Sequence, residues 1–462
     1  MPTSRPPTRP KGTHAWTALW AILSLAAPAV AAPHGGPGGV ERGGAVVTRG
    51  DGGGERRAGA AVPPASGLTA VADTLELVLV SERPWTSAVA VTLSFTGGYG
   101  DDPPGAEGTA WLLGMVLERA AGASLAETGA VTAIEVEGDR TWVTLLTTSG
   151  DWASAYHILT RTLLTDPLDP ALAAETRADL SGQVFFQRDA PVRAFELEAR
   201  RMLVGAERAR PPMGTPSSVS GMTVEALEAT RARIYRVDRA RLAVVGAVEP
   251  TEAVSIVGAH RTMARRGEQA WVVEGAPLPP RAPGWAWETG GRTSVADDIT
   301  NNWIQAAYPF AGATPRWPME FLAHVIGEQL VISLPAPGLI SRRVEVRELP
   351  GGPVLQVTIA ARWPTVRAWE QRIVDIVDHL SAGNLSPNEV NRQYRRFRTA
   401  RALALADPER EGRQLLINAE SDGGLREPLV PMKGLSSGEV QRAAADLGEP
   451  RVLVYGPGGP PS

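Results

Sequence analysis

Hydrophobic residues recur at alternate positions in two segments, 75–81 (LELVLVS) and 87–98 (SAVAVTLSFTGG). Successive side chains of a β-strand point to opposite faces, so this pattern predicts two strands, which we expect to pair with each other. Residues 131–148 hold two further runs of this kind around Gly138 and Asp139, a combination suited to a tight turn, and they predict a hairpin. The first patterned region therefore contains a sheet.

The segments that follow change to the helical period. Apolar residues recur at three- and four-residue intervals in the stretches that begin at Asp151, Asp169 and Pro191, which predicts three helices. A further helix is predicted over 223–235, where a threonine can cap the first turn. The apolar run that begins at Arg241 predicts a closing strand. We therefore expect an α+β unit whose sheet is covered by helices on one face.

Prolines and glycines interrupt the pattern over 275–292, which we interpret as a linker. The same order of elements then repeats, with strands predicted at 302–308 and 353–361, helices from Pro318, Thr365 and Ser386, and a last strand near the end of the chain. The clearest internal echo pairs 223–246 (TVEALEATRARIYRVDRARLAVVG) with 436–456 (SSGEVQRAAADLGEPRVLVYG). Each is a helix followed by an apolar strand that closes on a glycine, as in a duplicated unit.

Chain length agrees with a duplication. The sequence has 462 residues, too many for one compact core and suited to two domains once the ends are set aside. We expect an α+β fold of two duplicated halves, 68–274 and 293–462, each a mainly antiparallel sheet covered by helices.

The N-terminal region predicts export. Residues 1–31 place arginines and a lysine before an apolar run and then small residues, the order of a cleavable signal peptide, and no cysteine follows to receive a lipid. A retained membrane anchor is the alternative, although the apolar run is shorter than the ~20 residues that span a bilayer. Residues 32–67 are rich in glycine with scattered arginines, which predicts a flexible tether. We expect a periplasmic or extracellular protein that meets a membrane only if residues 1–31 are kept.

The composition of the chain excludes several kinds of binding site and catalytic site. The 46 basic and 50 acidic residues give a net charge of -4, without the basic excess of a nucleic-acid-binding protein. The chain has no cysteine, which excludes disulfides, thiolate metal sites and cysteine nucleophiles. It also lacks the G-x-S-x-G, Walker and H-E-x-x-H motifs.

One group of residues has the spacing of a metal site. Glu320, His324 and Glu328 lie four residues apart and so share one face of a predicted helix. The other face carries apolar residues, as in a helix with its charges in solvent, and this is the interpretation we favour. A hydrolase with its metal at these three residues is kept as an alternative.

The segment TGGYGDDPPGAEGTAWLLGMVL, residues 96–117, resembles the insulinase-like metallopeptidases (pitrilysin, mitochondrial processing peptidase). In that family a helix carries an inverted zinc motif, His-x-x-Glu-His. The matching glycine, alanine and leucines are present here, but Trp111 and Met115 stand at the two histidine positions and Gly114 at the position of the glutamate base. Residues 211–250, from a Gly-Thr-Pro turn to the closing strand, resemble the family as well.

The remaining family positions are also changed. The resemblance places Thr176 at the third zinc ligand, with Glu175 one residue away. In the second half it places Ile340 and, more loosely, Arg347 where active members use an arginine and a tyrosine to hold substrate. Because an indole and a thioether do not replace imidazole as zinc ligands, we expect no catalytic residue, no metal and no other cofactor.

The resemblance implies a non-catalytic homologue. We expect a pseudo-subunit that pairs with a homologous active zinc peptidase subunit in peptide processing, or that self-associates, with a peptide as the possible ligand and no nucleic acid. A stand-alone periplasmic peptide- or protein-binding module is the second hypothesis. The hydrolase with a relocated metal site is the third.

Overall fold

The computed structural model describes residues 68–73, 76–187, 190–206, 209–237, 240–257, 290–311, 314–332, 338–349, 352–362, 364–420 and 433–457. The predicted signal peptide, the predicted tether and most of the predicted linker lie outside these ranges. Within them, no helix combines the length and the apolar character needed to cross a bilayer.

The first sheet has six strands: β1 (Leu68–Asp73), β2 (Glu76–Glu82), β3 (Ala88–Thr96), β4 (Val131–Val136), β5 (Arg140–Thr148) and β6 (Ala240–Gly246). They lie in the order β1-β2-β6-β3-β5-β4, and every pair is antiparallel except β2 with β6. The predicted hairpin is β4 and β5. The predicted pairing of β2 with β3 is wrong, because β6 lies between them. An alternating pattern reveals a strand but not its neighbour.

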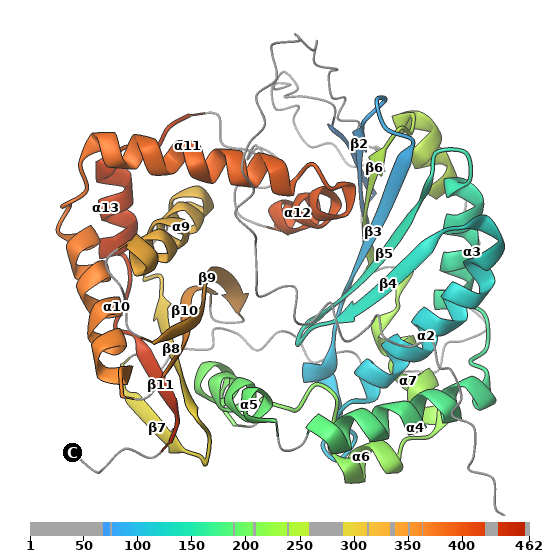
Figure 1. Ribbon diagram of the computed structural model, residues 1–462. Coiled ribbons are helices and arrows are strands. Elements are labelled where there is room, and N and C mark those ends of the chain that lie inside the picture. The colour runs from blue at the N-terminus through green and yellow to red at the C-terminus, as the bar shows by residue number, and fades with distance from the viewer. Residues whose placement is uncertain are drawn as a thin grey trace, which may run out of the picture.

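Helices cover one face of this sheet, on the right in Figure 1. The elements that belong to this layer and to its connections are η1 (Tyr99–Asp101), α2 (Thr109–Leu125), η2 (Ala126–Thr128), α3 (Trp152–Leu164), α4 (Pro170–Gln187), α6 (Pro216–Ser220) and α7 (Val224–Ile234). Helix α2 packs on β4 and contacts α3, α4 and α7. It is therefore the centre of the layer.

The second half repeats this arrangement. Strands β7 (Arg292–Ala296), β8 (Asn301–Pro309), β9 (Leu339–Leu349), β10 (Gly352–Arg362) and β11 (Arg451–Gly456) lie in the order β7-β11-β8-β10-β9. This order matches β2-β6-β3-β5-β4 strand for strand, including the parallel first pair. The helices are α9 (Arg316–Ile332), α10 (Val366–Ser381), α11 (Pro387–Ala404) and α13 (Ser437–Ala445). The chain is thus a duplicated α+β fold with mainly antiparallel sheets.

The first sheet was expected to carry helices on one face, but it carries them on both, because the halves exchange a helix. Helix α5 (Pro191–Val204) follows α4 in the first half but packs on β8 and β11 of the second sheet. Helix α12 (Pro408–Glu420) belongs to the second half but packs on β2, β3 and β6 of the first. Figure 1 shows both helices between the two sheets.

The strand sequences allow this exchange because both faces of the central strands are apolar. In β6, Leu242 and Val244 join the core under α2, whereas Ala243 and Val245 join a second cluster with Leu415 and Leu416 of α12. The interface also depends on a small residue. A Cβ at Gly412 would lie 2.7 Å from Oγ1 of Thr92 on β3, closer than real contacts, so glycine lets α12 approach the sheet.

Polar groups fix α12 at its first turn. Glu411 forms an ion pair with Arg83, which follows β2, and accepts a hydrogen bond of 2.5 Å from Oγ of Ser81. The Glu411 and Arg83 side chains are only 7% and 14% exposed, so each charge depends on the other for compensation. At the other exchanged helix, Phe195 of α5 packs on Trp303 and Tyr455 of the second sheet, with ring centroids 6.0 and 6.2 Å away.

Candidate functional site

The start of α2 is held by a carboxylate from the preceding loop. Asp102 accepts hydrogen bonds from the backbone N–H groups of Gly108, at 2.8 Å, and Ala110, at 3.0 Å, two of the groups left unpaired at a helix N-terminus. Its side chain is fully buried, with Nη2 of Arg233 3.8 Å away. Burial raises the pKa of Asp102 to about 7 against the opposing effects of the two backbone donors and Arg233.

The two segments that carry the family resemblance meet at this helix start. Gly108 has φ +90°, and a Cβ there would lie 2.6 Å from the carbonyl of Met213. Gly214, with φ +77°, would place a Cβ 2.1 Å from the carbonyl oxygen of Glu107. Ser218 donates to that same oxygen at 2.8 Å. These glycines are needed for a close contact between two backbones, and that need is independent of any catalysis.

The three degenerate positions of α2 make a packed surface. Trp111 and Met115 are partly buried and pack against the first hydrophobic core. Gly114 is buried between them, where β4 crosses the helix. A Cβ on Gly114 would lie 2.8 Å from Cγ2 of Val136 and 3.4 Å from Cγ2 of Ile134. A side chain such as glutamate therefore fits at this position only if the Val136 side chain or β4 shifts.

Thr176, which the resemblance places at the third zinc ligand, also faces α2. Thr176 on α4 is fully buried, and its Oγ1 accepts a hydrogen bond of 3.1 Å from Nη1 of Arg119. Nη2 of the same guanidinium donates to Asp179 at 2.6 Å. Glu175 is exposed to solvent and does not join them. Sequence reasoning placed Thr176 but missed Arg119, which lies one helical turn after Met115 and could have been found by that spacing.

Glu118 lies on α2 one helical turn after Gly114, and its carboxylate has a structural contact. Glu118 accepts a hydrogen bond of 3.0 Å from the backbone N–H of Ile134 and so joins α2 to β4. Burial raises the pKa of Glu118, and the hydrogen bond from Ile134 opposes the rise. Tryptophan, glycine, methionine and threonine supply no set of donors that fits zinc, and an arginine lies where α2 faces α4. We derive no metal-dependent step from this site.

On α9, the two glutamates of the alternative metal site form ion pairs with arginines. Glu320 is 14% exposed and lies 2.6 Å from Nε of Arg316 and 3.1 Å from Nη1 of Arg401, while Glu328 pairs with Arg342 and Arg396. His324 stacks against Phe321, and its pKa is lowered chiefly by burial. The described part of the chain contains no group of three metal-ligating side chains that could hold an ion. This face of α9 packs under α11 instead of lying in solvent.

The predicted substrate-holding stretch forms β9. Ile340 on this strand is half exposed, and Arg347 is exposed. Burial raises the pKa of Tyr99 in η1, and the charges of Arg200 and then Arg347 oppose that rise. The guanidinium of Arg200, on the exchanged helix α5, lies over the Tyr99 ring at 4.6 Å. Two cationic side chains from different elements thus act on one buried tyrosine.

No family model and no curated protein sequence matches this chain. Solved structures do. An inactive M16 peptidase domain from Pseudomonas fluorescens has a TM-score of 0.68 at 14% identity, covering 86% of this chain and 99% of its own. The periplasmic protease PqqL from Escherichia coli has a TM-score of 0.65 at 10% identity, covering 85% of this chain and 46% of its own.

A third similar structure belongs to a large assembly. A chain of complex III from Candida albicans has a TM-score of 0.60 at 15% identity and covers 82% of this chain and 93% of its own. These likenesses define the class of fold, that of the M16 or insulinase-like peptidases. The resemblance inferred from the sequence is thereby confirmed at the level of the fold.

Proposed function

We propose that this chain is an exported, non-catalytic M16-like subunit that pairs with an active zinc peptidase of the same fold. The observation that carries the proposal is the closed position on α2. The resemblance places Gly114 where the family has its base, and a side chain there would have to displace the Val136 side chain of β4. Trp111 and Met115 on the same helix are partly buried and pack against the core, which supports a helix preserved as architecture.

The similar structures support the partner in this proposal. The chain spans nearly all of a domain described as inactive and most of a chain from a multi-subunit complex, and it matches about half of a periplasmic protease. Because a fold does not fix the function placed on it, a chain of this fold can serve as a subunit without performing the chemistry.

The test is purification of the protein from its own cells, with metal analysis and identification of the chains that co-purify. We expect substoichiometric zinc, no peptidase activity in the isolated chain, and activity only when a co-purifying zinc subunit is present. One tightly bound zinc per isolated chain, with chelator-sensitive cleavage, would refute the proposal and favour the hydrolase with a relocated metal.

A stand-alone peptide-binding module is the second candidate. It is favoured by the guanidinium of Arg200 on α5, which lies 4.6 Å over the Tyr99 ring, and by Arg347 on β9, whose charge also acts on Tyr99. Such a pair suits the carboxylate of a peptide. Binding of a fluorescent peptide by the isolated chain, lost in Arg347→Glu and retained in Arg347→Lys, would support this candidate over the pseudo-subunit.

A further inference from the structure

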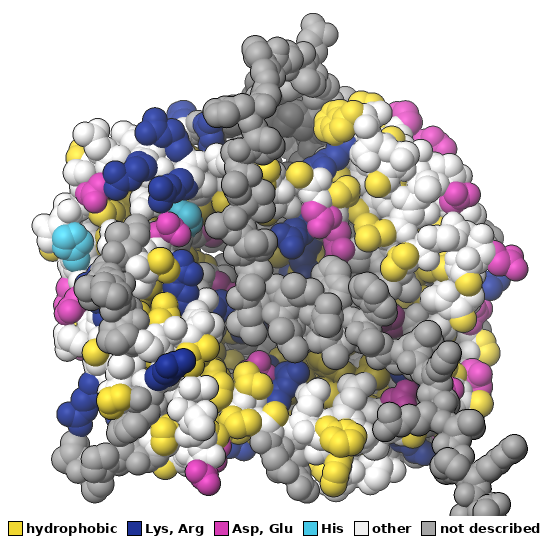
Figure 2. All heavy atoms as spheres, in the orientation of Figure 1, with side chains coloured by type: hydrophobic (Ala, Val, Ile, Leu, Met, Phe, Trp, Pro, Cys, Tyr) yellow, Lys and Arg dark blue, Asp and Glu magenta, His cyan; other side chains and the backbone are white. Residues whose placement is uncertain are grey.

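The arginines of α11 fall into two groups with different surroundings. Arg396 and Arg401 approach α9, where their guanidiniums lie 3.6 Å from Glu328 and 3.1 Å from Glu320. The other three, Arg392, Arg395 and Arg398, do not pair with α9 and are exposed, as Arg396 also is. Figure 2 shows basic side chains gathered at the upper left, where Figure 1 places α11. The first group pairs with carboxylates of α9, and the second does not.

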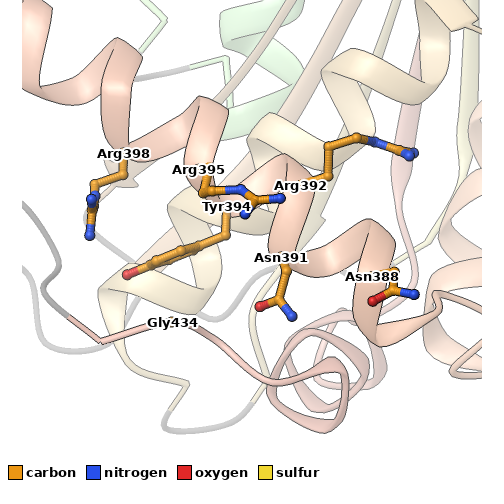
Figure 3. Close-up of a pocket in the computed structure, with 7 residues that line it drawn as sticks. All are labelled: Asn388, Asn391, Arg392, Tyr394, Arg395, Arg398 and Gly434. Carbon is orange, nitrogen blue, oxygen red and sulfur yellow. The ribbon is translucent and has the colours of Figure 1, made fainter.

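The exposed arginines line a groove of about 510 Å³ between α11 and the segment before α13. Asn388, Asn391 and Tyr394 line it with them, and Gly434 forms the opposite side. Figure 3 shows Tyr394 and Asn391 pointing from α11 toward the segment that carries Gly434. Tyr394 is anchored because its hydroxyl donates to the carbonyl of Lys433. The volume lies in the range of about 300–1,000 Å³ found for ligand clefts.

No acidic residue is among those that line the groove. The carboxylate of Glu389 lies 3.9 Å from Arg392 but accepts hydrogen bonds at the start of α11, and that of Glu439 does the same for Ser436 at the start of α13. Among the described residues, neither Arg395 nor Arg398 forms an ion pair. Like charges three residues apart on a helix repel each other, so an anionic ligand would relieve this repulsion.

The shape of the site favours a peptide. A groove can admit an extended chain, whereas a bilayer presents a flat surface to a protein. The exposed amides of Asn388 and Asn391 can donate to and accept from a peptide backbone, which carries both kinds of group in every residue. The guanidiniums can pair with carboxylates in a bidentate geometry.

We propose that this groove binds an acidic peptide segment of another protein. Carboxylates of the segment pair with Arg395 and Arg398, and its backbone bonds to the asparagine amides. The groove lies on the outer side of the second half, so the proposal does not depend on whether the chain is a pseudo-subunit.

The probe is a fluorescein-labelled peptide of ten glutamates, followed by anisotropy at low ionic strength. Arg395→Glu with Arg398→Glu should weaken binding at least tenfold. Arg362→Glu with Arg367→Glu changes the net charge equally at exposed positions elsewhere in this half and should weaken it less than threefold. Gly434→Leu leaves the charge unchanged and fills the groove, since a Cβ at 434 has no neighbour within 4 Å. It should weaken binding at least fivefold.

Equal losses in the two charge-reversal variants, no effect of Gly434→Leu, or no binding of the peptide would each overturn the proposal. Anionic vesicles of phosphatidylglycerol and a 20-nucleotide oligo-dT are tested in parallel. Tighter binding of either, insensitive to Gly434→Leu, would show a basic surface instead of a peptide groove. Melting curves of all variants confirm that they fold, so a loss is assigned to the groove.

Discussion

Two glycines of α2 provide a direct test of whether the position of Gly114, which the resemblance places at the family's glutamate base, is closed to a side chain. Both lie inside the helix, but a Cβ at Gly114 meets Val136 at 2.8 Å, whereas a Cβ at Gly122 has no neighbour within 4 Å. Replacing a helical glycine with alanine stabilises a helix by about 0.5–1 kcal/mol, and this is the whole effect expected for Gly122→Ala. Overpacking in a core costs about 1–3 kcal/mol, so Gly114→Ala should be destabilising by about 0–2 kcal/mol.

The assay is thermal melting of the purified variants. One kcal/mol shifts the midpoint by about 2–4 °C in a unit of 150–250 residues, so the two variants should differ by several degrees, with Gly122→Ala the more stable. Val136→Ala should be less harmful when Gly114→Ala is present, because it removes the clashing methyl groups. If Gly114→Ala melts as high as Gly122→Ala and shows no coupling to Val136→Ala, the position is open and the reasoning fails.

Further predictions concern the interface between the halves and the cap of α2. Glu411→Ala leaves Arg83 without its partner and should cost about 3–5 kcal/mol, measured by denaturant unfolding; a change below ~1 kcal/mol would contradict the buried pair. Phe195→Ala should cost about 3–5 kcal/mol and increase proteolysis between the halves, and an unchanged digestion pattern would count against the exchange of α5. For Asp102 the pKa is raised from 3.8 to about 7, so its contribution, about 4 kcal/mol, is complete below pH 3.8 and is lost as the pH rises toward 7. The advantage of the wild type over Asp102→Asn in melting temperature should therefore shrink from pH 5 to pH 8, and a constant difference would show that this carboxyl is not perturbed.

Many of the strands and helices could be predicted from the sequence because each element has its own period, but β1, β7 and β9 were missed. The hairpin, the helices from 151, 169 and 191, and the repeated helix-strand unit all follow from local pattern. The pairing of β2 with β6 could not be predicted, since the two strands are far apart in the chain. Helix α12 was also missed. The continuous apolar run of β6 (RLAVVG) indicates burial on both faces, and that signal could have shown that a second layer was needed.

The sequence shows which residues stand at the positions that the resemblance assigns, but not how they pack. Trp111 and Met115 are visible as substitutions, yet the closing of the space at Gly114 depends on β4, which lies twenty residues further on. The cap by Asp102 and the bond from Arg119 to Thr176 join segments that no local pattern connects. The expectation that the charged face of α9 lies in solvent was wrong, because α11, a distant segment of the chain, packs on that face.

The exchange of α5 and α12 has a consequence for synthesis on the ribosome. The first sheet is translated by residue 246, but the helix that shields its inner side is not made until residue 420. During that interval Leu79 and Val245 have no cover, so the nascent chain offers an apolar surface to chaperones or to other chains. The first sheet therefore completes its packing only after α12 of the second half has been made.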